Sequence, residues 1–261
     1  MQVVILCGGQ GTRLRERTEF MPKPLVEVGG RPILWHVMKI YAHHGFTDFV
    51  LALGYLGHKI KEYFLRYEAW RTEDFRFHFD AARGEGEVEP LREGTERWHI
   101  LFADTGQQTP TGGRIKLLEP YLQGDTFLAT YADGVADLDL RALLDFHRAH
   151  GRLATLTAVR PISPFGLLDL AEDGCITRFL EKPRMEQWIN GGFFVFERGV
   201  LDYLRPNSVL EREPFERLAT EGQIYAYQHT GFWACMDTYK DTEMLNRLWE
   251  TGQAPWKIWD E

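Results

Sequence analysis

The stretch QVVILCGGQGTRL, residues 2–14, joins an apolar run to a glycine-rich turn and decides the fold class. Residues 3–6 are uninterrupted aliphatic side chains, a pattern typical of a strand buried on both faces of a parallel sheet. Gly8, Gly9 and Gly11 then end the strand. Because ligands of open α/β sheets bind beyond the carboxyl ends of the strands, this turn is predicted to border a binding site.

Helix and strand patterns alternate after this turn. Pro32 opens an amphipathic stretch that Gly45 closes, which predicts a helix over residues 32–44. A strand over residues 48–53 and a helix over residues 57–70 follow. The order strand, loop, helix, strand, helix predicts a parallel sheet with helices on its faces.

Residues 72–97 interrupt this alternation. Phenylalanines at 75, 77 and 79 alternate with polar residues, and a polar, acidic, glycine-bearing stretch follows over residues 81–96. We expect an arm, either a long loop or a hairpin, because long irregular segments of compact domains often serve function or face a partner. The alternation then resumes with helix 115–122, strand 126–131, a helix capped by Asp139 and strand 153–159.

The pattern becomes rich in short strands beyond Pro161. Short apolar runs at residues 167–170, 176–179 and 193–196 are separated by glycine turns, which indicates a mixed, partly antiparallel sheet. A last helix is predicted over residues 239–250 and an aromatic tail follows it. We expect one domain over residues 1–261, with 161–237 as a strand-rich part.

The composition narrows the classes of partner. The 261 residues carry a net charge of −8, so nucleic acid and anionic membranes are disfavoured as partners. Apolar runs of membrane length are absent, and the N-terminal run is too short for a signal peptide. The cysteines Cys7, Cys175 and Cys235 lie far apart, which argues against a disulfide framework or a zinc site and fits a reducing cytoplasm.

The glycine turn is a candidate phosphate-binding loop. Backbone N–H groups of Gly8, Gly9 and Gly11 can point at phosphate oxygens, and the planar Arg13 guanidinium suits a phosphate. The spacing is that of neither a Walker A loop nor a G-x-G-x-x-G dinucleotide motif, which disfavours a dehydrogenase. A tight turn that binds no ligand is the alternative.

A clamped lysine and two aspartates follow this loop in sequence. Pro22 and Pro24 restrict the backbone around Lys23, which would hold its ammonium stiffly near a phosphate. Asp133 ends a predicted strand and Asp237 precedes the last helix, and two such carboxylates suit Mg²⁺. The alternatives are a turn for the first aspartate and a helix N-cap for the second.

Polar residues in the strand-rich part suit a sugar phosphate. Lys182 can neutralise the phosphate, Glu181 can accept hydrogen bonds from sugar hydroxyls, and Asn190 offers a donor and an acceptor. Arg114, two residues after Gly112, is a candidate for a phosphate or a base edge. Its alternative is a solvated arginine at a helix start.

These motifs, in this order, resemble those of the nucleotidyltransferases that activate sugar 1-phosphates. The resembling stretches run nearly end to end and include GGQGTRL, MPKPLVEVGGRPILWHVMKIYAHHG, DTGQQTPTGGRIK, YADGVADLDL, LEKP, NGGFFVF and HTGFWACMDTYKD. Several of them look most like the branch that uses CTP and α-D-glucose 1-phosphate. One departure is Met21, where some members carry a lysine in K-P-K-P.

The resemblance implies a single Rossmann-like α/β nucleotidyltransferase domain with a mixed, mostly parallel sheet. It implies cytidylyl transfer from CTP to α-D-glucose 1-phosphate with Mg²⁺ as cofactor, in homo-oligomers that are commonly hexamers. By this resemblance, the residues that contact the nucleotide are Leu6, Gly8, Gly9, Gly11, Thr12, Arg13, Lys23, Thr111, Arg114 and Asp133. The residues that contact the sugar phosphate are, by the same resemblance, Glu181, Lys182, Asn190 and Gly191. It assigns catalysis to Arg13, Lys23 and Lys182, and Mg²⁺ to Asp133 and Asp237.

Two alternative functions remain at this stage. A sister enzyme would use dTTP or UTP, since base choice depends on a few contacts. A non-catalytic regulatory subunit would bind a sugar nucleotide without turnover, and it predicts the loss of Lys23 or of the metal ligands, which are all present. We expect subunit contacts at the arm and at the tail that holds Trp256 and Trp259.

Overall fold

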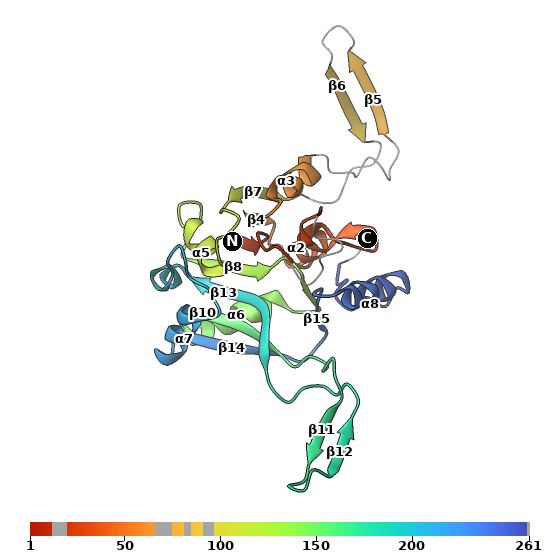
Figure 1. Ribbon diagram of the computed structural model, residues 1–261. Helices are drawn as coiled ribbons and strands as arrows, with labels where there is room; N and C mark the ends of the chain where they lie inside the picture. The colour runs from red at the N-terminus through yellow and green to blue at the C-terminus, as the bar shows by residue number, and fades with distance from the viewer. Residues whose placement is uncertain (12–19, 66–74, 81–84, 91–96, 260–261) are drawn as a thin grey trace.

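A seven-stranded sheet forms the centre of the computed structural model, which describes residues 1–11, 20–65, 75–80, 85–90 and 97–259 (Figure 1). Its strand order is β14-β10-β13-β8-β1-β4-β7. The bounds are β1 Gln2–Leu6, β4 Asp48–Leu53, β7 His99–Asp104, β8 Thr126–Tyr131, β10 Ala154–Val159, β13 Ile189–Glu197 and β14 Ile224–His229. Only β13 pairs antiparallel to its neighbours among these strands. The predicted mixed, mostly parallel α/β sheet is confirmed.

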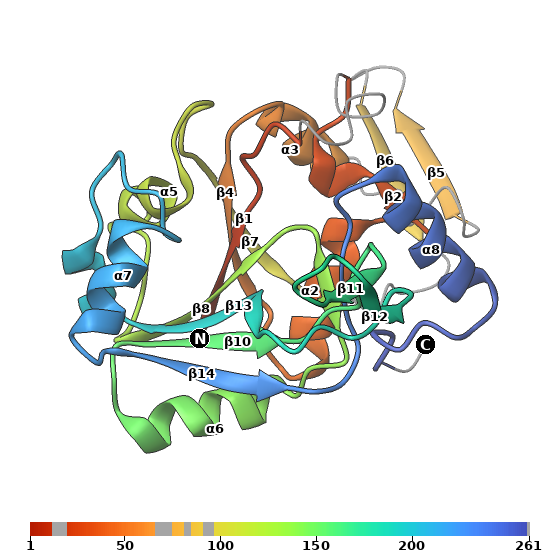
Figure 2. The same ribbon diagram turned by 60° about the horizontal axis from the view of Figure 1, so that its bottom comes forward.

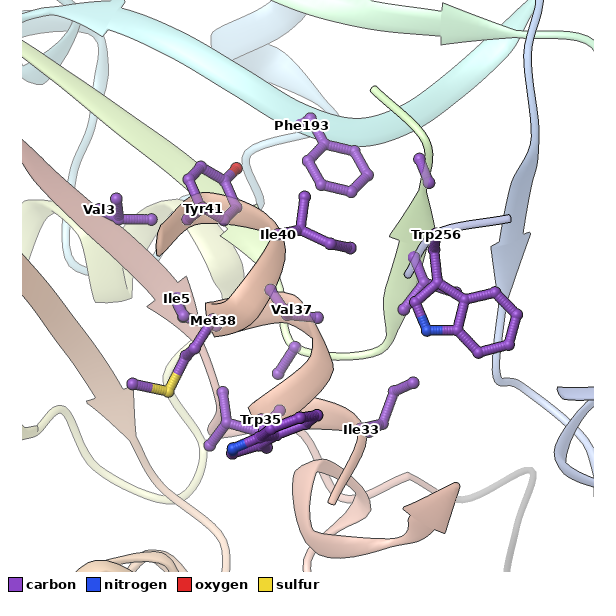
Figure 3. Close-up of a cluster of buried hydrophobic side chains, with 14 of the residues drawn as sticks. Val3, Ile5, Ile33, Trp35, Val37, Met38, Ile40, Tyr41, Phe193 and Trp256 are labelled. Atoms are coloured by element: carbon purple, nitrogen blue, oxygen red, sulfur yellow. The ribbon is translucent and has the colours of Figure 1, made fainter. Parts of the chain in front are cut away.

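Helices cover both faces of the sheet (Figure 2). Val3 and Ile5 of β1 join one core with α2 (Ile33–His43), α6 (Leu140–His150) and α8 (Tyr239–Glu250). Val4 and Leu6 join the other core with α5 (Thr111–Leu117) and α7 (Glu213–Thr220). Figure 3 shows the first core, with Val3 and Ile5 beside α2. Burial of both faces explains why the aliphatic run of β1 is uninterrupted.

Most element predictions agree with the structure, with one shifted helix and two strands of the central sheet that were not predicted. Strands 48–53 and 126–131 and helix 239–250 are observed with those bounds. The helix predicted at 115–122 is α5, which begins four residues earlier, at Thr111. A Cβ on Gly113 would lie 2.1 Å from the Pro206 carbonyl oxygen, so the glycines allow α5 to pack closely there. The sequence patterns did not predict β7 and β14.

Two hairpins project from opposite ends of the molecule in Figure 1. Within the arm, β5 (Phe75–Asp80) pairs antiparallel with β6 (Glu85–Pro90). The other residues between 72 and 96 lie outside the part of the chain that the structure describes. The second hairpin, from the strand-rich part, consists of β11 (Leu167–Leu170) and β12 (Ile176–Leu180). Shorter elements complete the fold: β2 Glu27–Val28, β3 Arg31–Pro32, α3 Gly57–Leu65, β9 Gly134–Ala136, β15 Trp233–Cys235 and the 3-10 turns Lys23–Leu25 and Arg198–Tyr203.

The aromatic tail packs inside its own chain. Trp256 is fully buried and Trp259 is 7% exposed, both in the core that contains α2. The Trp256 indole N–H donates to Nδ1 of His36, and His36 Nε2 lies 2.8 Å from the Val28 carbonyl oxygen. These two rings are therefore covered within the chain, and the expected subunit contacts of the tail stay a prediction.

Protonation of His36 is expected to destabilise the protein in mild acid. Burial lowers its pKa from the ordinary 6.5 to about 4. The His36 of the unfolded chain therefore binds a proton at higher pH than the His36 of the folded chain. The contribution of His36 to the free energy of unfolding is full above pH 6.5 and falls as the pH drops towards 4. We expect His36 to contribute about 2 to 3 kcal/mol of the loss at pH 4.5. Thermal melts at pH 7.5 and 4.5 should show a smaller drop for His36→Gln. Equal drops in both proteins would contradict this prediction.

Candidate active site

A cavity of about 620 Å³ opens at the carboxyl ends of β1 and β8. The residues predicted from the glycine loop, the clamped lysine, the TGGR motif and the two aspartates meet around it: Leu6, Gly8, Gly9, Gly11, Lys23, Thr111, Arg114, Asp133 and Asp237. Tyr131 and Cys235 also line the cavity, and the sequence motifs did not single them out. Thr12 and Arg13 lie outside the described residues, so their roles stay predictions.

The glycine loop has no room for side chains where it meets Arg114. A Cβ on Gly8 would lie 2.1 Å from the centre of the guanidinium. The Gly8 carbonyl oxygen accepts hydrogen bonds from Arg114 at 3.0 Å and from the Tyr55 backbone N–H at 3.2 Å. Gly11 has a φ of 59°, in the left-handed region that favours glycine. The loop thus turns sharply out of β1 and exposes its backbone to the cavity.

Arg114 fixes the floor of the cavity. Its side chain is directed inward, and the residue is only 4% exposed. The guanidinium donates to the Leu53 carbonyl oxygen at 2.9 Å, to Thr105 Oγ1 at 2.6 Å and to the Gly106 carbonyl oxygen at 2.8 Å. With the bond to Gly8, it ties together the ends of β1, β4 and β7. The alternative of a solvated arginine is wrong, and the predicted contact with a nucleotide stays a prediction.

Lys23 bridges the two aspartates. Its Nζ lies 2.5 Å from Asp133 Oδ2 and 2.7 Å from Asp237 Oδ1, and only 12% of its side chain is exposed. Burial by itself would lower the pKa of Lys23, but the charge of Asp133 and hydrogen bonds to both carboxylates raise it. Lys23 therefore carries a positive charge at neutral pH.

Backbone pairing brings the two aspartates together across 104 positions of sequence. Cys235 of β15 pairs with Gly134 of β9, and the Met236 N–H donates to the Asp133 carbonyl oxygen at 2.9 Å. Thr238, rather than Asp237, caps α8 through a capping box with Asp241. The predicted N-cap alternative for Asp237 is wrong, and its carboxylate faces the cavity instead.

The site fits a divalent cation by its donor chemistry. Ligand atoms of Asp133, Cys235 and Asp237 all lie within 4.8 Å of one another. The ammonium between the two carboxylates shows that a positive charge is stable at this place. Mg²⁺ takes oxygen ligands, so the two carboxylates suit it. Burial raises the pKa of the Cys235 thiol, which keeps that group neutral beside them.

The predicted sugar-phosphate residues split into two groups. Asn190 lies next to the cavity, because its Nδ2 donates to the hydroxyl of the lining residue Tyr131 at 3.4 Å. The carbonyl oxygen of the neighbouring Gly191 accepts a hydrogen bond from the Trp233 indole N–H. Glu181 and Lys182 follow β12 and are exposed, with Lys182 at a φ of 47°. The cavity lining does not include them, so their role stays a prediction.

Comparison with known proteins shows the family of the chain. The nucleotidyl transferase family model matches residues 2–253, and the chain belongs to that family. It is 47% identical to the glucose-1-phosphate cytidylyltransferase of Salmonella typhi over the full length of both chains. It is 46% identical to a probable glucose-1-phosphate cytidylyltransferase of Bacillus subtilis, over 99% of this chain and all of the other. The predicted resemblance to this branch is confirmed.

Solved structures show the same fold at lower identity. HddC from Yersinia pseudotuberculosis, complexed with GMP-PN, has a TM-score of 0.65 and 20% identity, over 95% of this chain and 99% of the other. A putative glucose-1-phosphate thymidylyltransferase from Bacillus anthracis has a TM-score of 0.68 and 18% identity, over 100% and 98%. Separately, the helices within the described residues are all too short or too polar to cross a bilayer.

Proposed function

We propose that this nucleotidyltransferase transfers the cytidylyl group of CTP to α-D-glucose 1-phosphate and releases pyrophosphate. The observation that carries the proposal is the Lys23 ammonium, shared by Asp133 and Asp237 at the wall of a cavity that the glycine loop borders. The relatives at 46% and 47% identity, which cover the full chain, support CTP and glucose 1-phosphate as the substrates.

The proposed mechanism needs charge neutralisation and alignment rather than a general base. The sugar phosphate oxygen attacks the α-phosphorus of CTP in line, and this nucleophile is already ionised at neutral pH. Lys23 offsets the repulsion between the two anionic reactants, and the glycine backbone orients the phosphates. Mg²⁺, held by Asp133 and Asp237, would supply further positive charge at the phosphates. We assign the departing pyrophosphate to Arg13 and the sugar phosphate to Lys182, on sequence grounds.

Pyrophosphate release tests the proposed function directly. The protein is incubated with Mg²⁺ and α-D-glucose 1-phosphate, and CTP, UTP, dTTP, ATP and GTP are compared in parallel. Release with CTP far above the others is the expected result. A preference for dTTP or UTP would assign the chain to a sister specificity. A folded protein that binds CTP without any release would favour a regulatory subunit instead.

We also propose that the chain forms a homo-oligomer, with a hexamer as the expected state. The β11–β12 hairpin supports this, because its large apolar side chains face solvent: Leu167, Leu168, Leu170, Ile176 and Phe179 are 44% to 62% exposed. Several large apolar side chains exposed on one hairpin are typical of a protein interface.

Charge placed on this hairpin is expected to break the oligomer. Leu168 and Phe179 are opposite each other across the two strands, so Leu168→Asp with Phe179→Asp puts two charges at one place. We expect the molar mass from light scattering to fall towards that of one chain. Tyr121→Asp, an exposed aromatic site after α5, serves as the control and should leave the mass unchanged. An unchanged mass in the hairpin variant would place the interface elsewhere.

A cytoplasmic location is a further proposal. The three cysteines Cys7, Cys175 and Cys235 are free thiols in the structure, as a reducing compartment favours. Fractionation of cells that produce the protein tests this: activity in a periplasmic or membrane fraction would contradict it.

A further inference from the structure

A hydrogen-bonded chain beside the cavity links two of its lining residues, Thr111 and Tyr131, through the exposed Glu211. Thr111 Oγ1 donates to Glu211 Oε2 at 2.7 Å, and the Tyr131 hydroxyl donates to Glu211 Oε1. The Tyr131 hydroxyl also accepts from Asn190 at 3.4 Å. Thr111 and Tyr131 line the cavity, whereas Glu211 is outside the lining among the described residues. One carboxylate thus connects the predicted nucleotide wall to the predicted sugar wall.

Both ends of this chain are fixed by the fold. On the nucleotide side, Thr111 begins α5, and its Oγ1 also accepts from the Leu210 N–H at 2.9 Å. The Gly113 N–H donates to the Ser208 carbonyl oxygen at 2.9 Å, which holds the segment before Glu211 against α5. The carboxylate is therefore set by backbone contacts on one side and is directed across to β8 on the other.

On the sugar side, the Tyr131 ring has little freedom. A Cβ on Gly192 would lie 2.5 Å from the ring, so only a glycine fits beneath it, and Phe194 meets the ring edge-on at 5.6 Å between centroids. With the ring held in this way, the Tyr131 hydroxyl is directed at the Glu211 carboxylate, to which it donates. Tyr131 is also two residues from Asp133, at the end of the strand that carries this aspartate.

We propose that Glu211 is a positioning residue that holds Thr111 and Tyr131, and through Tyr131 also Asn190, at the spacing that the two substrates need. The inference rests on the proposed function, since it assigns the nucleotide to the Thr111 wall and the sugar phosphate to the Tyr131 wall. The hydrogen bonds, rather than the charge, perform this role. A glutamine can accept from the tyrosine and donate to the threonine, so Glu211→Gln preserves both links.

The separate Michaelis constants of the two substrates test this role. Glu211→Ala should raise KM for CTP and for α-D-glucose 1-phosphate, each about five-fold, as expected for one lost hydrogen bond per wall. Tyr131→Phe should raise only KM for the sugar phosphate, and Thr111→Val only KM for CTP. Glu211→Gln should restore both constants to within about two-fold of wild type. Partial unfolding changes the amount of active enzyme but leaves KM unaltered.

Glu213→Ala is the matched control. Glu213 is an exposed glutamate two residues further on, and its side chain pairs with Arg217 at 3.4 Å. Its constants should equal those of wild type. Unchanged KM values in Glu211→Ala, or a Glu211→Gln variant as impaired as Glu211→Ala, would overturn the proposal. If wild type releases no pyrophosphate, the proposed function fails separately. In that case titration calorimetry gives the dissociation constants of CTP and glucose 1-phosphate for wild type and variants. The role of Glu211 is then tested by comparing these constants in place of the KM values.

Discussion

Replacing Asp133 by asparagine is expected to lower the rate of pyrophosphate release by about a thousand-fold. Asparagine keeps the shape of the side chain but removes the negative charge. Asp237, which also contacts Lys23, would remain as the one charged oxygen ligand of the pair. A site with half its charge holds a divalent cation less tightly and leaves the phosphates less neutralised. Each 1.36 kcal/mol of lost stabilisation costs a factor of ten in rate.

The measurement is kcat at several Mg²⁺ concentrations, with circular dichroism to establish folding. Asp145→Asn is the control, because this exposed aspartate on α6 pairs only weakly with Arg148, at 3.5 Å. We expect the control to match wild type, and the Asp133 variant to need more Mg²⁺ to reach its reduced maximum. A folded Asp133→Asn protein that turns over near the wild-type rate would remove this residue from the metal site.

The position of Asp133 was predictable because local sequence determines it. A mostly apolar strand followed by Asp-Gly places a carboxylate at the carboxyl edge of the sheet, where the glycine loop of β1 also lies. The glycines after β1 and Lys23, which was predicted from its two flanking prolines, also line the cavity as expected. Strand pattern and turn chemistry act over a few residues, so one sequence is enough to read them.

The direction of Arg114 was not predictable in this way. Its acceptors are carbonyl oxygens at the ends of β4 and β7, and β7 itself escaped prediction. Glu211 presents the same difficulty, since it belongs to a segment without periodic pattern and meets Tyr131 from 80 positions away. The positions of both side chains depend on tertiary contacts between segments far apart in sequence. Glycines such as Gly113 allow these contacts, because they let two backbone segments approach closely.

Replacing Lys23 by methionine is expected to change catalysis and metal binding in opposite directions. Methionine keeps much of the length and the apolar stem but removes the charge that offsets repulsion between the two anionic substrates. We expect kcat to fall about a hundred-fold or more. Lys23→Arg should not restore the rate, because a planar guanidinium does not match a point charge held between two carboxylates.

The affinity for Mg²⁺ should rise in the same variant. In the structure the ammonium lies 2.5 Å from Asp133 and 2.7 Å from Asp237, so it competes with a cation for both carboxylates. Without it, two facing negative charges attract a divalent ion more strongly. Titration calorimetry with Mg²⁺ should show a lower dissociation constant for Lys23→Met than for wild type. The control is Lys116→Met, which removes a lysine that pairs with Glu119, and it should match wild type in both kcat and Mg²⁺ affinity. A weaker Mg²⁺ affinity alongside the lower kcat would mean that Lys23 organises the aspartates for the metal rather than competing with it.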